Sequence, residues 1–391
     1  MKESQLLDPS YLLEKARRET GLQDFGEPSL TEPLAMLTGS LRDEAQLNAF
    51  GLQAWHDRLL NFLTGRLRAQ YWFTHCPEIL DEDIKQPLII LGLARTGSTL
   101  LHRLIASDRR FHSAAWWEGR FPVPAPDDIL GEQRLASAKA EMAAILAANP
   151  ELKAIHPWDP LGADEDNHLL DLTLMSTTHE AMACVPSYHT WIARQDLRPA
   201  YAYWKKMLQL LQWQKKQRGL SAERWVLKTP VHLGYVDVIA EMFPDSSYIQ
   251  THRDPLSTIP SYASMMYSLW AGVSDSPDPV EAGRQAIATL GRNLNHCLQV
   301  RDRLPANRFF DVDYRETVSD PVGLMERIYR HLELPMTAET LDGIQQYLKG
   351  NPREKRPPHH YTLEQFGFTE AQIEQRFMEY RRRYIALEAR R

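Results

Sequence analysis

A glycine-containing turn between a buried strand and a helix is the first place where this sequence could bind an anion. Gly92, Gly97, Ser98 and Thr99 have the spacing of a phosphate-binding loop, with Ser98 where the usual lysine stands. Backbone N–H groups and the dipole at the helix start attract an anion whatever the side chains are. Arg95 and the two hydroxyls supply further donors. Because the missing lysine is the one that reaches the terminal phosphates of ATP or GTP, an ordinary nucleoside triphosphatase is disfavoured.

Arg253 and Ser261 form a second candidate anion site. Arg253 follows the apolar run at 247–251, and Ser261 lies about two turns into the predicted helix that comes next. Two side chains at this separation can hold one phosphate between them. Two anion sites at neighbouring strand ends indicate a ligand with two separate anionic groups.

A parallel sheet would bring these two sites together. From residue 87 onwards, short apolar runs alternate with turns and helical periods, which is typical of βα units. The carboxyl ends of parallel strands meet at one edge of a sheet, where ligands bind. We expect strands near 88–92, 225–228, 247–251 and 308–312, and helices near 97–107, 232–242, 255–269 and 319–332.

Helical segments are expected on either side of the first strand. Residues 1–86 show apolar positions at helical spacing and predict an N-terminal helical extension, and residues 87–391 form the main domain. Within that domain, residues 134–218 read as a helical insertion, rich in aromatic residues, over the edge where an acceptor would bind. The predicted fold is therefore an α/β, three-layer, P-loop-like fold with a central parallel sheet.

Composition excludes several classes of protein. The 391 residues carry a formal net charge of -6, which disfavours a general nucleic-acid binder. The apolar runs are too short for a membrane span and the N-terminus does not read as a signal peptide, so we expect a cytoplasmic protein. The histidines lack metal-ligand spacing, and no metal site is predicted. We expect the partner to be a small molecule.

The two anion sites resemble those of the sulfotransferases that use 3'-phosphoadenosine 5'-phosphosulfate (PAPS). The family's 5'-phosphosulfate loop is similar to residues 93–99, and its 3'-phosphate motif places a serine eight residues after an arginine, as here. The similarity runs from about residue 87 to about 335 and includes the segments around Lys228 and Tyr314. It is strongest to the branch with bacterial small-molecule members and the tyrosylprotein sulfotransferases, because arginine replaces lysine in the loop.

This resemblance implies a donor, a product and a set of contacts. PAPS would be the co-substrate, 3'-phosphoadenosine 5'-phosphate (PAP) would be released, and no metal would be required. In-line sulfuryl transfer needs cations at the leaving oxygen and a base at the acceptor hydroxyl. Arg95 and Lys228 are the candidate cations. The nucleotide contacts implied are Arg95, Thr96, Gly97, Ser98, Thr99, Arg253, Ser261 and Tyr314, with Arg356 in a late basic loop.

Two residues are candidates for the general base. Glu118 follows the first helix where the tyrosylprotein branch has its glutamate, and the flanking Trp116 and Trp117 could desolvate it. His232 follows the Lys228 strand, where other sulfotransferases place a histidine, but in a shifted register. We favour Glu118. The acidic run 164–166 is expected to be an exposed helix start.

Two other functions are compatible with the pattern. A P-loop-type small-molecule kinase would need ATP and a magnesium-binding acid, and a non-catalytic nucleotide-binding protein could retain the fold without turnover. Aromatic residues in the insertion favour an amphipathic alcohol or phenol as the acceptor, whose identity the sequence does not give. The oligomeric state is also left open, with a homodimer among the alternatives.

Overall fold

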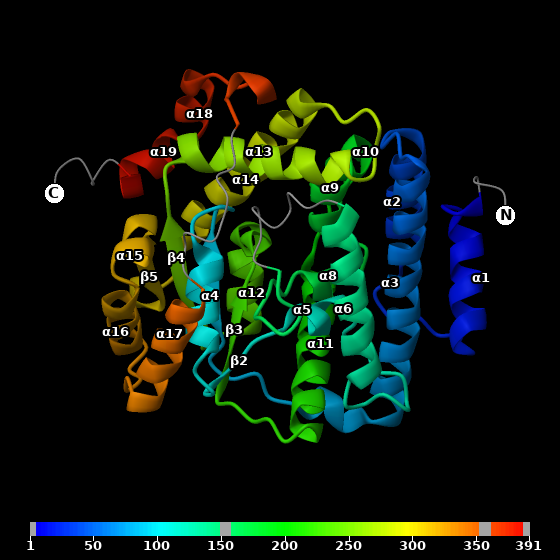
Figure 1. Cartoon of the computed structure of the whole chain (residues 1–391), viewed down its shortest axis with the longest axis horizontal. Helices are drawn as coiled ribbons and strands as arrows, with labels where there is room; N and C mark the ends of the chain where they lie inside the picture. The colour runs from blue at the N-terminus through cyan, green and yellow to red at the C-terminus, as the bar shows by residue number, and fades with distance from the viewer. Residues whose placement is uncertain (1–4, 149–157, 352–360, 386–391) are drawn as a thin grey trace.

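Five parallel strands form the centre of the molecule (Figure 1). The computed structural model describes residues 5–148, 158–351 and 361–385. The strands stand in the order β2-β3-β1-β4-β5. Every neighbouring pair is parallel. Their bounds are β1(Leu88–Gly92), β2(Phe111–His112), β3(Arg224–Lys228), β4(Ser247–His252) and β5(Phe309–Asp313).

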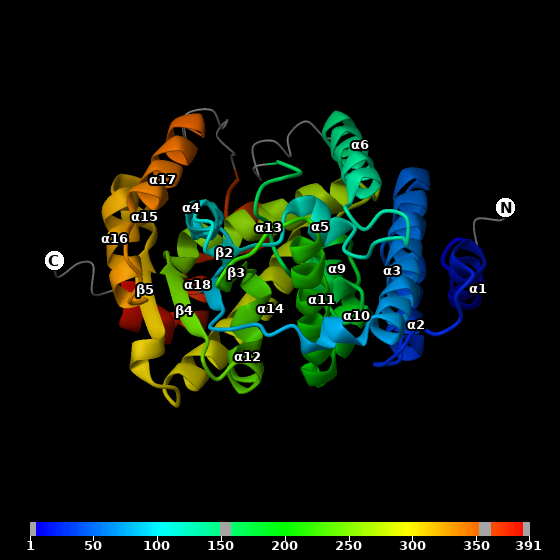
Figure 2. The same ribbon diagram turned by 90° about the horizontal axis from the view of Figure 1, so that it is seen from below.

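The central strands are apolar because helices cover both faces of the sheet. Leu88 and Ile90 of β1 pack in one core cluster, whereas Ile89 and Leu91 pack in another on the opposite face. Such continuous apolar runs are typical of buried parallel strands. One face is covered by α4(Ser98–Ala106), α16(Pro321–His331) and α17(Ala338–Gly350), and the other by η3(Pro230–Tyr235), α12(Val236–Met242) and α14(Pro279–Arg301). The result is the three-layer arrangement of Figures 1 and 2.

The helices before β1 lie at the opposite end of the molecule from α15(Tyr314–Ser319), α16 and α17 (Figures 1 and 2). They are α1(Pro9–Thr20), α2(Thr31–Asp43), α3(Ala49–His75) and η2(Pro77–Asp81). Trp72 of α3 packs on Trp213 of α11(Arg198–Gln217), with ring centroids 5.5 Å apart. The N-terminal helices thus share a hydrophobic core with the helices between β2 and β3.

The segment between β2 and β3 is mostly helical. It contains α5(Trp116–Arg120), α6(Glu132–Ala148), α8(His168–Asp171), α9(Thr178–Met182), α10(Pro186–Ile192) and α11. After β4 comes α13(Pro255–Ala271), and the chain continues to α18(Glu370–Arg376) and α19(Met378–Tyr380). Within the described ranges, no helix is both long and apolar enough to cross a bilayer.

The expected α/β class and its parallel sheet are confirmed, with three local differences. The two-residue strand β2 was not predicted, because so short a strand leaves no pattern of its own. The helix expected from residue 232 starts earlier, as the 3-10 turn η3 at Pro230. The helix expected at 319–332 is present as α16, but the short helix α15 before it was not predicted; Asp320 leaves helical geometry between the two and caps α16.

Candidate active site

The loop between β1 and α4 is built to present backbone donors. Arg95 and Gly97 adopt positive φ angles of 71° and 82°, and α4 begins directly afterwards at Ser98. The Thr96 hydroxyl, which is fully buried, lies 2.6 Å from that of Thr251 and donates to the Leu93 carbonyl at 2.8 Å. Thr96 thus fixes the loop from behind, while the first N–H groups of α4 are left to face an anion.

Gly97 is required by its surroundings as well as by its backbone. A Cβ atom at this position would lie 3.0 Å from the ring of Tyr314, in addition to the strain of its positive φ angle. The ring of Tyr314, at the start of α15, therefore packs directly against the loop.

Arg95, Arg253, Ser261 and Tyr314 come together at the carboxyl ends of β1, β4 and β5. Arg253 donates to the Arg95 carbonyl at 3.0 Å, and its guanidinium lies 4.2 Å from the centre of the Tyr314 ring. The Arg95 Nε atom donates to the Ser261 hydroxyl at 3.3 Å. Residues from three strand ends thus form one polar cluster beside the loop. Arg356 lies outside the described residues.

Lys228 approaches the same loop from β3. Its side chain is only 1% exposed, and its Nζ atom lies 2.8 Å from Glu165 Oε1 and 3.4 Å from the Thr99 hydroxyl. The register of the sheet explains this position, because Lys228 pairs with Ile90 of β1, two residues before the strand ends. An ammonium group therefore stands beside the start of α4.

A cleft of about 260 Å³ opens next to the loop. Arg95, Ser98 and Thr99 form one side of it. Much of the remaining wall is apolar and comes from several elements. Its apolar and aromatic members are Ala94, Trp116, Ile145, Trp158, Ala181, Met182, Pro230, Val231, Tyr262, Met265 and Leu269. The cleft can therefore hold a partly apolar molecule against the anion-binding loop.

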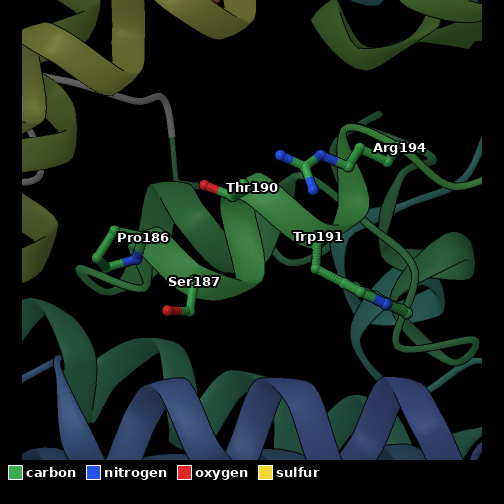
Figure 3. Close-up of a pocket in the computed structure, with 5 residues that line it drawn as sticks. All are labelled: Pro186, Ser187, Thr190, Trp191 and Arg194. Atoms are coloured by element: carbon green, nitrogen blue, oxygen red, sulfur yellow. The ribbon is translucent and has the colours of Figure 1, made fainter.

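A second hollow lies on α10, beside α2 (Figure 3). It measures about 420 Å³ and is lined by Pro186, Ser187, Thr190, Trp191 and Arg194. Trp191 donates to Glu32 of α2 at 3.0 Å, so part of the hollow is the seam between two packed helices. Because none of the loop residues line it, we place the active site at the smaller cleft.

Glu118 has surroundings that do not fit a general base. Its carboxylate is 2% exposed and is paired with Lys215, at 2.7 Å, and with Arg218, both from α11 or its C-terminal end. It also accepts the Ala115 N–H at 2.9 Å. Burial alone would raise the pKa of Glu118, but the two cations outweigh it and lower the pKa to about 2. The carboxylate is thus saturated with partners, and it is not among the residues that line the cleft.

His232 is also placed away from the cleft. The ring is fully buried, with Nε2 at 2.8 Å from Asp166 and Nδ1 at 3.0 Å from the Tyr201 hydroxyl. Both ring nitrogens therefore already have partners, and the residue does not line the cleft. The geometry argues against direct proton transfer by either of the two expected bases.

The acidic run before α8 is the feature that sequence reasoning misjudged. Asp164 and Asp166 are 4% and 1% exposed, so the expectation of an exposed helix start is wrong for both. Glu165 between them is partly exposed and lines the cleft. The run of three consecutive acidic residues was the feature of the sequence that could have pointed to this site. Within the described residues, no cluster of three or more metal-ligating side chains occurs.

Comparison with known proteins gives a consistent result. Residues 87–338 match the model of the sulfotransferase family. The omega-hydroxy-beta-dihydromenaquinone-9 sulfotransferase Stf3 of Mycobacterium bovis is 25% identical over 287 residues, which is 71% of each chain. The crystal structure of sulfotransferase STF1 from Mycobacterium tuberculosis H37Rv is similar at a TM-score of 0.82 and 30% identity, covering 95% of this chain and 98% of that one. Sulfotransferase STF9 from Mycobacterium avium is similar at a TM-score of 0.86 and 27% identity, with 96% of both chains covered.

Proposed function

The chain belongs to the sulfotransferase family, and we propose that it transfers a sulfuryl group from PAPS to a hydroxyl of a small amphipathic alcohol or phenol. The observation that carries this proposal is the meeting of two anion-binding groups at one sheet edge. Arg253 and Ser261 both contact Arg95 of the β1 loop. Such a cluster suits a nucleotide with phosphates at two positions.

The donor side supplies positive charge where the reaction needs it. We propose that the loop and the start of α4 bind the 5'-phosphosulfate through backbone N–H groups, Ser98 and Thr99, while Arg253 and Ser261 bind the 3'-phosphate. Negative charge grows on the bridging oxygen as the sulfuryl group leaves. Lys228, 3.4 Å from the Thr99 hydroxyl, and Arg95 are positioned to stabilise that charge.

The acceptor side is a mixed surface. Trp116, Trp158 and Met182 offer apolar contact, whereas the hydroxyl to be sulfated would face the loop. One relative is named for a substrate with a hydroxyl on a dihydromenaquinone. An apolar body with a terminal hydroxyl fits the same description, so we propose this general class of acceptor here.

Transfer from labelled PAPS tests the proposal. The purified chain is incubated with labelled PAPS and a panel of phenols, sterols and fatty alcohols, and sulfated products and PAP are separated. We expect label on at least one hydroxyl compound together with an equal amount of PAP. Tight PAP binding without transfer to any acceptor would favour a non-catalytic nucleotide-binding protein. The absence of both PAP binding and sulfuryl transfer would contradict the proposal.

A further inference from the structure

Sulfuryl transfer in the cleft would require a group that accepts the proton of the attacking hydroxyl. Glu118 and His232 are buried among other partners. Three carboxylates line the cleft among the described residues, namely Glu141, Asp164 and Glu165. Glu141 is bound by Arg120 at 2.7 Å, and Asp164 is buried and accepts a backbone N–H at 2.7 Å. Of these three, Glu165 is the one that accepts a hydrogen bond from Lys228, at 2.8 Å.

Glu165 lies at the boundary between the donor loop and the cleft. Its Oε1 atom is 2.8 Å from Lys228 Nζ, which in turn lies 3.4 Å from the Thr99 hydroxyl. Its Oε2 atom accepts the Thr229 hydroxyl at 3.3 Å. Lys228 is 1% exposed and Glu165 is 28% exposed, so the lysine stands behind and the carboxylate faces open space. A hydroxyl entering the cleft can therefore reach the carboxylate without displacing a buried group.

The segment that carries Glu165 is anchored on both sides. The Asp164 N–H donates to the Ala114 carbonyl at 2.9 Å. Asp166 accepts the Lys228 N–H at 2.7 Å and also binds His232 at 2.8 Å. Glu165 is thus held at a fixed place relative to the end of β3, as a group that receives a proton in the transition state must be. His232 thus helps to hold Asp166 in place.

We propose that Glu165 is the general base for the acceptor hydroxyl, an inference that rests on the proposed sulfuryl transfer. In this step the acceptor O–H proton moves to the Glu165 carboxylate as the acceptor oxygen forms its bond to sulfur. The bond between sulfur and the bridging oxygen of PAPS breaks, and its electron pair stays on that oxygen beside Lys228. PAP then leaves, and Glu165 returns the proton to water.

Two substitutions at Glu165 separate a base from a residue that only holds Lys228. Glu165→Gln retains an oxygen that can accept from Lys228 but loses its basicity, whereas Glu165→Asp retains basicity on a shorter side chain. General bases contribute about 10² to 10⁴ in rate. We expect Glu165→Gln to lose about 10²-fold or more in kcat and Glu165→Asp to lose clearly less, with PAP affinity within about threefold of wild type for both.

Glu82→Gln is the matched control, because Glu82 pairs with Lys216 at 2.6 Å outside the cleft and should affect turnover little. PAP binding by calorimetry confirms that each variant is folded. The inference is overturned if Glu165→Gln retains more than about a tenth of wild-type turnover. It is also overturned if Glu165→Asp has a lower turnover than Glu165→Gln. A loss of PAP affinity that matches the loss of turnover would also overturn it. Absence of transfer by the wild-type chain would instead contradict the proposed function itself.

Discussion

Two lysine–glutamate pairs differ in their relation to the cleft: Glu165 of one pair lines it, whereas neither member of the other pair does. In the Lys215–Glu118 pair, the side chains are 9% and 2% exposed, and Arg218 adds a second cation. In the Lys228–Glu165 pair, the lysine is 1% exposed but the glutamate is 28% exposed. We call Lys215–Glu118 the closed pair, because both side chains are buried, and Lys228–Glu165 the open pair, because its carboxylate lines the cleft. We therefore expect similar residue types to serve packing in one pair and chemistry in the other.

The Lys215–Glu118 pair lies among aromatic rings, including Trp117, one of the two tryptophans that flank Glu118 in the sequence. Arg218 lies 5.1 Å from the centre of the Trp117 ring, and Lys215 lies 5.7 Å from that of Trp225. Aromatic neighbours do desolvate this carboxylate, but they bury its cations with it. Desolvation raises the basicity of a carboxylate when the group has no counter-charge, and here it has two.

The largest effect that would distinguish the pairs is on stability. Removing one partner of a buried ion pair leaves uncompensated charge and costs about 3 to 5 kcal/mol. We expect Glu118→Gln to lower the free energy of unfolding by this amount, measured by denaturant unfolding, with turnover per folded molecule retained. The matched control Glu241→Gln removes the partner of Arg198 in an exposed pair and should cost less than about 1 kcal/mol. A collapse of turnover at unchanged stability would return the base role to Glu118.

Removal of the two lysines should separate an effect on turnover, at Lys228, from an effect on stability, at Lys215. Loss of one donor to a developing negative charge typically costs about 10² to 10³ in kcat. We expect a loss of this size for Lys228→Met, whereas Lys215→Met should mainly reduce stability. Steady-state kinetics on the folded fraction of each variant makes the comparison. Equal loss of turnover in both variants would show that the two pairs are not functionally distinct.

Arg253 tests whether the open pair lies beside a nucleotide with a 3'-phosphate. Hydrogen bonds to charged groups contribute about 1.5 to 3 kcal/mol, or about ten- to a hundredfold in affinity. We expect Arg253→Ala to weaken PAP binding by this factor in calorimetry. Binding of adenosine 5'-phosphosulfate, which has no 3'-phosphate, should change little. Similar losses for both ligands would mean that Arg253 does not bind the 3'-phosphate.

The smallest expected effect is a pH-dependent difference in stability between wild type and Glu118→Gln. Folding lowers the pKa of Glu118 from 4.5 to about 2, so its charge stabilises the folded state above pH 4.5. That contribution is lost as the pH falls from 4.5 towards 2, because the unfolded state then takes up a proton at this carboxyl while the folded state does not. We expect the gap in unfolding free energy between wild type and Glu118→Gln to shrink from pH 6 towards pH 3. A gap that stays constant would contradict the lowered pKa.

Features that depend on residues close together in the sequence were predicted, whereas contacts between distant residues were not. The loop at Gly92–Thr99 and the Arg253–Ser261 spacing are local patterns, and the strands that carry them were placed to within a residue or two. The partners of Glu118 could not be predicted, because Lys215 is 97 residues away. The Lys228–Glu165 contact spans 63 residues in the same way. Charge neutralisation by distant residues decides which carboxylate can act as a base, and it leaves no local pattern.

Calorimetric titration with PAP and with ATP and magnesium tests the central claim most directly, because it measures the donor site without an acceptor. We expect PAP to bind at least about ten times more tightly than ATP, since Arg253 and Ser261 would bind its 3'-phosphate and the loop has no lysine for a γ-phosphate. Binding of ATP equal to or tighter than that of PAP would contradict the assignment of this site to a sulfuryl donor.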